Sequence, residues 1–247
     1  MRVLKPVFIA HRGYAAVYPE NTLIALDAAR QAGAVYVEVD IQLSADLVPV
    51  LFHDRDLQRL CQQSGAVHDY TFSQLEQFNA TFEEKFGKRY VNNKITSLAV
   101  FINYLKEHPK LNAFIELKRS MIEKFGEECV LNTLLPLFKG MREQVSFISY
   151  NQSILKSIHS TTDYRTGIVV DEWHNYNKNS GWQSEWVFCS AEGLPEDDTE
   201  LEINSKLAVF EVGNMELANK LLARGIHYLE TFRIKEMLEA FSKGNNL

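Results

Sequence analysis

Residues 7–41 read VFIAHRGYAAVYPENTLIALDAARQAGAVYVEVDI, and they contain the pattern from which the fold class follows. The apolar run at 7–10 is typical of a strand buried on both faces, and residues 21–32 have the spacing of a helix. A second apolar run lies at about 35–41. A strand, a helix and a second strand in this order form a βαβ unit, in which the two strands are parallel.

The same alternation continues through the rest of the chain. Further strand candidates lie at about 48–53, 111–117, 144–149, 166–170, 185–190, 207–212 and 226–231. Helix candidates lie at about 97–107, 121–138, 154–160, 215–225 and 233–242. About eight main strand positions alternating with helices favour a TIM (β/α)8 barrel over a doubly wound open sheet. The sequence contains no GxGxxG or GxxxxGKS loop, which agrees with that choice.

The composition is that of a globular protein, since 46% of the 247 residues are hydrophobic and 23% are charged. One barrel domain accounts for residues 1–247, because α/β barrels reach about 250 residues as a single unit. The net charge of -6, without basic blocks, argues against nucleic acid as a partner and against docking on anionic membranes by charge. No window approaches the roughly 18 apolar residues that span a bilayer, so we expect no stable membrane insertion.

The cysteine pattern and the first residues point to a location in the cell. Three widely spaced cysteines without a CxxC pair, Cys61, Cys129 and Cys189, give little support to a disulfide framework or a thiolate zinc site. The apolar run within MRVLKPVFIAHRG is too short for a signal peptide. We therefore expect a cytoplasmic protein.

Carboxylates occur at the ends of two candidate strands. Glu38 and Asp40 lie at alternate positions, so their side chains point to the same side, and Glu116 ends the strand near 112–117. Three carboxylates at one barrel mouth would raise one another's pKa unless a cation compensated them. All-oxygen ligands suit Mg²⁺ or Ca²⁺, and open positions on the ion can bind substrate oxygens. Alternatively, each acid is a solvated strand-end residue or an ion-pair partner.

Cationic side chains and histidines end the same strands. Arg12 and Lys118 are suited to holding a phosphate, although pairing with the carboxylates is an alternative role. His11 and His53 end two extended runs beside charged residues. Two imidazoles on opposite sides of a phosphorus centre can act as base and acid. A metal site, a phosphate clamp and two acid/base groups together suit the cleavage of a phosphoryl ester.

Five motifs in this order resemble the glycerophosphodiester phosphodiesterase family. They are HRG at 11–13, PENT at 19–22, ExD at 38–40, HD at 53–54 and ExK at 116–118. The resemblance implies a TIM barrel with a small insertion after the second barrel strand, here about residues 54–95. It also implies that the metal ligands are Glu38, Asp40 and Glu116, that the catalytic histidines are His11 and His53, and that Arg12 and Lys118 bind the phosphate.

The activity implied by the resemblance is cleavage of a small-molecule glycerophosphodiester to sn-glycerol 3-phosphate and an alcohol. One alternative is a related barrel phospholipase acting on lysophospholipid or phosphoinositide head groups. A second alternative is a weakly active protein that binds a phosphate ligand.

The late strands depart from the family pattern. Phe210-Glu211-Val212-Gly213 stands where Trp-Thr-Val-Asn is usual, and Glu230-Thr231 stands in place of a Thr-Asp pair. Ile95-Thr96-Ser97-Leu98 replaces a Pro-Thr-Leu segment. These changes place the substrate preference in question more than the chemistry.

Two stretches interrupt the alternation, 54–95 and the aromatic segment 171–184, and both are expected at the face of the barrel where active sites form. The aromatic residues in and beside the second stretch are Trp173, Tyr176, Trp182 and Trp186. They either form a cage for a cationic head group such as choline or pack the loop and the core, and we favour packing.

Overall fold

The computed structural model describes residues 5–176, 182–196, 201 and 203–244. Eight parallel strands of this part of the chain form a closed barrel, because β1 pairs with both β10 and β2. The barrel strands are β1 (Val7–Ala10), β2 (Tyr36–Leu43), β5 (Asn112–Leu117), β6 (Val145–Ser149), β7 (Arg165–Val170), β8 (Trp186–Ser190), β9 (Lys206–Phe210) and β10 (Tyr228–Thr231). The prediction of a TIM barrel is confirmed.

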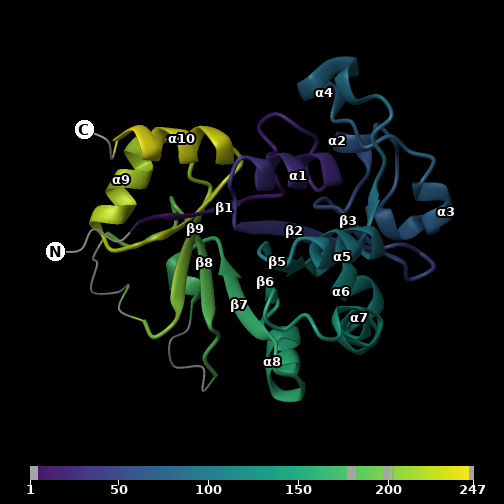
Figure 1. Cartoon of the computed structure of the whole chain (residues 1–247). Helices are drawn as coiled ribbons and strands as arrows, with labels where there is room; N and C mark the ends of the chain where they lie inside the picture. Colours follow the sequence, from purple (N-terminus) through teal and green to yellow (C-terminus); the bar gives the residue numbers. More distant parts are fainter. Residues whose placement is uncertain (1–4, 177–181, 197–200, 202, 245–247) are drawn as a thin grey trace.

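Helices lie around the barrel, and most of them connect one strand to the next (Figure 1). They are α1 (Leu23–Gln31), α5 (Leu98–Glu107), α6 (Arg119–Phe125), α7 (Glu127–Leu134), α8 (Gln152–Thr161), α9 (Met215–Ala223) and α10 (Ile234–Gly244). Their starts follow from the sequence. The Thr22 side chain accepts a hydrogen bond from the N–H of Ala25 at the start of α1, which contributes about 1 kcal/mol. Asn151 caps α8 in the same way through the N–H groups of Ser153 and Ile154.

The predicted helix over 121–138 is wrong as a single element. Gly126 has a φ of +79° and separates α6 from α7, because glycine adopts this left-handed backbone without the steric penalty of other residues. The last turn is a 3₁₀ helix, η3 (Leu135–Phe138), which contains Pro136. A further 3₁₀ turn, η4 (Trp173–Asn175), follows β7.

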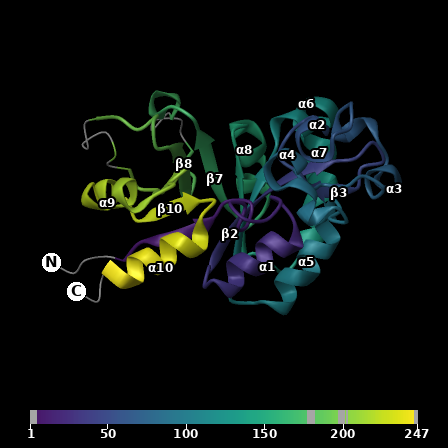
Figure 2. The ribbon, with the colours of Figure 1, turned by 90° about the horizontal axis from the view of Figure 1, so that it is seen from above.

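The segment between β2 and α5 leaves the barrel and forms a small unit of its own. It contains β3 (Pro49–Leu51), β4 (Thr96–Ser97), α2 (Gln58–Cys61), α3 (Phe72–Leu75), α4 (Glu83–Phe86), η1 (Val67–Asp69) and η2 (Gly87–Tyr90). Residues that include Leu57, Leu60, Val67 and Leu75 form its separate apolar core. Figure 1 and Figure 2 show α2, α3 and α4 on the side of the molecule away from α9 and α10.

The predicted extended run at 48–53 is a strand, but it is not part of the parallel barrel. β3 pairs antiparallel with β2, and the N–H of Phe52 donates to the carbonyl of Asp40 at 2.9 Å. The chain therefore passes beyond the end of the barrel in β2 and returns to it in β3. Because β2 extends beyond the barrel, the middle of β2 is level with the carboxyl end of the barrel, and the hairpin places His53 there.

Two apolar layers hold the barrel together. The interior contains Ile9, Phe114, Ile148, Val169, Trp186, Phe188 and Ala208. A larger layer, which includes Leu26, Val39 and Ile115, lies between the strands and the helices. Strands that are apolar on both faces match the continuous runs seen in the sequence. Among the described residues, none of the helices has the length and apolar character needed to cross a membrane.

Candidate active site

The three predicted carboxylates meet at the carboxyl end of the barrel. Glu116 lies opposite Asp40 in the parallel register of β2 and β5, and Glu38 lies two residues before Asp40. Ligand atoms of the three groups lie within 4.8 Å of one another, and all three side chains are buried. The Oε1 atom of Glu38 has no hydrogen-bond partner in the described part of the chain. An all-oxygen group with an unsatisfied buried oxygen fits a divalent cation such as Mg²⁺ or Ca²⁺.

The charges around these carboxylates differ, and so do the directions of their pKa shifts. Burial, with Asp40 adding to it, raises the pKa of Glu38 well above its ordinary value. Burial also raises the pKa of Glu116, although Lys118 opposes the shift. For Asp40, burial is outweighed by Lys118 and Arg12, which hold its pKa well below the ordinary value. A bound cation would favour the ionised form of all three groups.

The two predicted phosphate-binding cations contact the carboxylates directly. Nζ of Lys118 lies 2.7 Å from Oε1 of Glu116 and 3.2 Å from Oδ1 of Asp40. Nε of Arg12 lies 3.1 Å from Oδ2 of Asp40, and its Nη1 donates to Glu20 at 3.0 Å. Although burial disfavours both cations, these carboxylates raise the pKa of Arg12 and of Lys118, so both remain charged. The predicted alternative, pairing with the acids, is therefore present in the structure.

Two residues beside the carboxylates have a strained backbone. Arg12 has a φ of 55° and Asn21 a φ of 57°, a region that costs a non-glycine residue about 1–2 kcal/mol. The strain is offset by direct contacts with the site. The N–H of Arg12 donates to Oε2 of Glu38 at 3.1 Å, and Nδ2 of Asn21 donates to Oδ2 of Asp40 at 2.8 Å. Both residues therefore help to fix the orientation of the acidic group.

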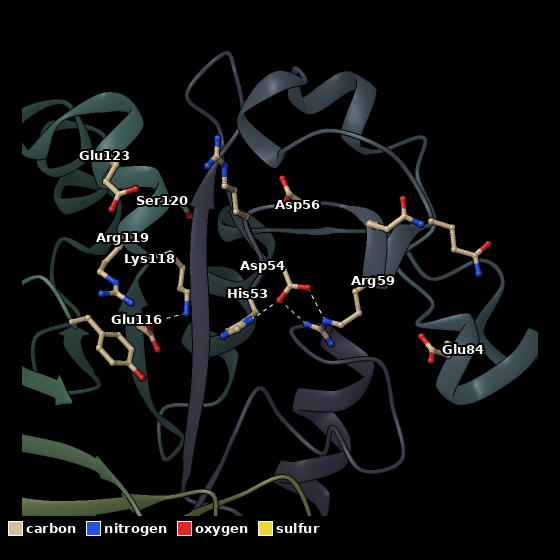
Figure 3. Close-up of a pocket in the computed structure, with 14 residues that line it drawn as sticks. His53, Asp54, Asp56, Arg59, Glu84, Glu116, Lys118, Arg119, Ser120 and Glu123 are labelled. Atoms are coloured by element: carbon tan, nitrogen blue, oxygen red, sulfur yellow. Dashed lines mark hydrogen bonds and ion pairs between the residues drawn. The ribbon is translucent and has the colours of Figure 1, made fainter. Parts of the chain in front are cut away.

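His53 is oriented by a chain of charged groups that the sequence predictions did not include. Its Nδ1 lies 2.7 Å from Oδ1 of Asp54, and Nε of Arg59 donates to Oδ2 of Asp54 at 2.6 Å (Figure 3). Burial of Asp54 is outweighed by its hydrogen bonds to His53 and Arg59, which hold its pKa below the ordinary value. Arg59 also binds Glu20. The HD and PENT motifs contain Asp54, Glu20 and Asn21, so the motif letters were the signal that could have found them.

His11 lies between two carboxyl groups and against an aromatic ring. Its Nε2 is 3.8 Å from Oε2 of Glu38, and its Nδ1 is 4.0 Å from Oε2 of Glu230. The ring stacks on Phe232, with centroids 4.3 Å apart. Burial, with Arg12 adding to it, lowers the pKa of His11 well below its ordinary value. Burial, with Glu116 adding to it, raises the pKa of Glu230.

Two connected hollows open at this end of the barrel. A cavity of about 230 Å³ is lined by His11, Arg12, Glu38, His53, Glu116, Lys118, Ile148, Tyr150, Val169, Asp171, Phe188, Phe210, Glu211 and Glu230. A cleft of about 1160 Å³ shares His53, Glu116 and Lys118 with it and runs between the insertion and α6 (Figure 3). The cleft is lined mostly by charged and polar side chains, which include Asp56, Arg59, Glu84, Arg119 and Glu123.

Some of the late-strand residues that depart from the family pattern line the cavity, whereas the predicted aromatic residues do not. Phe210, Glu211 and Glu230 line the cavity, whereas Gly213 does not. Trp186 begins β8 and fills the barrel interior, and Trp173 is buried with Tyr176 against the outer core. The cavity lining contains none of the four predicted aromatic residues, which supports the favoured alternative that they pack the loop and the core.

Comparison with known proteins agrees with the geometry. A model of the glycerophosphoryl diester phosphodiesterase family matches residues 11–226. Glycerophosphodiester phosphodiesterase 1 of Bos taurus is 36% identical over 122 residues, which cover 48% of this chain and 37% of the bovine protein. Glycerophosphodiester phosphodiesterase of Caldanaerobacter subterraneus is 28% identical over 178 residues, which cover 69% of this chain and 71% of that protein.

A solved structure extends the likeness to nearly the whole chain. A phosphodiesterase of Oleispira antarctica, in complex with the product sn-glycerol-3-phosphate, shares 25% identity and a TM-score of 0.82, with 97% of each chain covered. The match to the bovine protein spans little more than a third of that protein's length, 37%. The family model, by contrast, matches all five motifs from His11 onward. The chain belongs to the glycerophosphoryl diester phosphodiesterase family.

Proposed function

We propose that this protein is a metal-dependent phosphodiesterase that hydrolyses glycerophosphodiesters to sn-glycerol 3-phosphate and an alcohol. One observation carries the proposal: six of the seven predicted site residues line a single cavity of about 230 Å³, and the seventh, Asp40, pairs with two of them. The Oleispira antarctica structure, with sn-glycerol-3-phosphate bound, supports the choice of product. The substrate is a small molecule.

The location that we propose is cytoplasmic, because three free cysteines suit a reducing compartment.

Glu38, Asp40 and Glu116 would hold the divalent cation, Mg²⁺ or Ca²⁺. When bound, the cation supplies charge neutralisation at the phosphate and lowers the pKa of an attacking hydroxyl. Four buried acids, Glu38, Asp40, Glu116 and Glu230, lie at the site beside the two cations Arg12 and Lys118, so a divalent cation would also reduce the repulsion among the acids.

The residues of the chain bind the phosphate and move the protons. Arg12 and Lys118 hold phosphate oxygens, since both cations lie at the cavity and remain charged. One of His11 and His53 takes the proton from the attacking hydroxyl, and the other gives a proton to the leaving alkoxide. His53 is held by Asp54 at 2.7 Å, which fixes its ring for this exchange.

The lining of the large cleft argues against the rival phospholipase activity. The cleft beside His53 and Lys118 is lined mostly by charged and polar groups, which suit a polar head group better than an acyl chain. A lysophospholipid would leave its apolar chain against Asp56, Glu84 and Glu123 or in water.

The test is cleavage of a panel of diesters, measured as glycerol 3-phosphate released from the water-soluble glycerophosphodiesters and as lysophosphatidic acid released from a lysophospholipid. Glycerophosphocholine, glycerophosphoethanolamine, glycerophosphoglycerol and a lysophospholipid are each incubated with the protein and Mg²⁺, Ca²⁺ or a strong chelator. We expect release from the water-soluble diesters, with the metal, and none with the chelator. Release that persists in the chelator would contradict the metal mechanism. No release from any diester, with phosphate ligands still bound, would identify a binding protein instead.

A further inference from the structure

Phe232 is a half-buried aromatic residue that belongs to none of the three apolar clusters of the described residues. It directly follows Thr231, the last residue of β10. It also lies outside the lining of both the cavity and the cleft. Neither core packing nor contact with a molecule in these two hollows explains the position of its ring.

The ring of Phe232 contacts the two side chains that directly follow β1. It stacks on the imidazole of His11, with centroids 4.3 Å apart and an angle of 10° between the planes. The guanidinium carbon of Arg12 lies over the same ring, 5.5 Å from its centroid. A near-parallel stack and a cation over an aromatic ring are both attractive contacts with a preferred geometry. One ring therefore contacts both a proposed proton carrier and a proposed phosphate-binding cation.

The backbone at the end of β10 is bonded to the same segment. The N–H of His11 donates to the carbonyl of Thr231 at 3.0 Å, and the N–H of Ala16 donates to the carbonyl of Phe232 at 3.0 Å. The two hydrogen bonds lie on either side of Arg12, whose backbone is strained at a φ of 55°. The ring of Phe232 therefore projects from a fixed backbone, as a rigid support for a functional side chain requires.

We propose that Phe232 is a positioning residue for His11 and Arg12: its flat ring holds the imidazole and the guanidinium in the orientations from which they face the cavity. Both of these side chains line the cavity, whereas Phe232 supports them from outside the lining. A displacement of about 1 Å at a reacting group can cost on the order of 10²-fold in rate, so such support matters for catalysis. The effect of Phe232 on turnover rests on the proposed function, but its effect on the orientation of the two side chains does not.

Simple filling of space is the rival explanation, and Phe241 in α10 illustrates it. Phe241 packs against the larger apolar layer, and its ring meets that of Phe8 in β1 edge-on, with centroids 6.4 Å apart. Phe232 differs in both respects, because it lies outside the apolar clusters and its ring is within 10° of parallel to that of His11. An aliphatic side chain of similar volume could replace a space-filling ring, but it has no flat face for His11 or Arg12.

The experiment compares the wild-type protein with Phe232→Leu, Phe232→Met, Phe232→Tyr and the control Phe241→Leu. All are measured with Mg²⁺, at a temperature well below the unfolding transition of each variant. Leucine and methionine keep an apolar side chain without a flat ring, whereas tyrosine restores the ring. If Phe232→Leu does not fold, Phe232→Met provides the same comparison.

Three quantities are measured on each protein. Steady-state kinetics with a water-soluble glycerophosphodiester give kcat and KM, and titration calorimetry gives the affinity for inorganic phosphate. The NMR shifts of the carbon-bound ring protons of His11 report the aromatic ring stacked on it. These signals are assigned by their loss in His11→Asn.

We expect kcat/KM to fall on the order of 10-fold in Phe232→Leu and Phe232→Met, because the imidazole is no longer held in its plane. Phosphate should bind about 2- to 5-fold more weakly, since the cation–π contact that orients Arg12 is lost. The His11 ring protons should shift downfield as the ring current of Phe232 disappears. Phe232→Tyr should keep all three properties, and Phe241→Leu should leave them unchanged.

Wild-type values in both Phe232→Leu and Phe232→Met would overturn the proposal, and so would equal losses in Phe232→Leu and Phe241→Leu. A Phe232→Tyr protein as impaired as Phe232→Leu would also overturn it, because the flat ring would then not be the cause. Absence of turnover in the wild-type protein would reject the proposed function instead. The ring-proton shifts and the phosphate affinity would then decide whether Phe232 orients the two side chains.

Discussion

Arg59 and Glu20, which are 39 residues apart in the sequence, form a bidentate ion pair. Nη1 of Arg59 lies 2.8 Å from Oε2 of Glu20, and Nη2 lies 2.7 Å from Oε1. Arg59 belongs to the insertion, whereas Glu20 belongs to the loop after β1. The same guanidinium binds Asp54, and Glu20 binds Arg12. The pair therefore connects His53, on one side of the cavity, to the group around Asp40 on the other.

Replacing Arg59 with Met should weaken both the insertion contact and catalysis. Glu20 would keep only its contact with Arg12, and Asp54 only its contact with His53, so each would have an oxygen left unsatisfied, which costs about 1–3 kcal/mol. Because Asp54 would no longer be fixed against His53, we expect a drop in kcat on the order of 10-fold with a smaller change in KM. Steady-state kinetics and urea unfolding measure the two effects.

The matched control for Arg59→Met is Arg89→Met. Arg89 is exposed in the same insertion and lies outside the cleft lining. Its replacement should leave kcat and the unfolding free energy within experimental scatter. Equal losses in the two variants would show that the pair with Glu20 is not what connects the insertion to the site.

Replacing either His11 or His53 with Ala should lower turnover by at least about 10²-fold, because each is proposed to carry a proton in the reaction. Diester hydrolysis with Mg²⁺ measures the effect. His174 is an exposed histidine that follows β7, and His174→Ala should retain the wild-type rate. Near-full activity in His11→Ala or His53→Ala would remove that residue from acid/base chemistry.

The sequence predicts the barrel and the seven polar residues that meet at its carboxyl end, because both depend on local patterns. Buried parallel strands are continuous apolar runs, and polar residues at their carboxyl ends fall together once the barrel closes. The antiparallel course of β3 was not predictable, since an apolar run such as 48–53 does not reveal the direction of its neighbour. The pairing of Arg59 with Glu20, and the stacking of Phe232 on His11, depend on contacts between distant segments.

Metal affinity should depend on pH through Glu38 and Glu116. Their pKa values are raised in the metal-free protein, chiefly by burial, so protons compete with the cation for these oxygens. As pH falls through the raised values, both groups take up protons and affinity declines. Asp40 adds no such dependence near neutrality, because its pKa is lowered. Titration calorimetry with Mg²⁺ at a series of pH values, in buffers of different ionisation enthalpy, measures the affinity and the protons released. Affinity that is constant between acidic and neutral pH would contradict the prediction.

Gly13 follows Arg12 in the HRG motif, and its replacement by Ala should strongly destabilise the fold. Its φ is +81°, and an added Cβ would lie 2.7 Å from the backbone carbonyl carbon of Ala25 in α1. Gly225 separates the two causes, since its φ is +80° but nothing lies within 4 Å of an added Cβ. Gly225→Ala should therefore lose only about 1–2 kcal/mol for the left-handed backbone.

Urea unfolding of the two glycine variants, at equal metal concentration, isolates the effect of the close approach. Gly13→Ala should lose at least about 2 kcal/mol more than Gly225→Ala, because the clash is with backbone and cannot be relieved by a side-chain rotation. Equal losses would mean that the loop after β1 can move away from α1 at little cost. Such a movement would also displace the strained Arg12, whose N–H donates to Glu38, so tight packing at Gly13 helps to keep Arg12 beside the carboxylates.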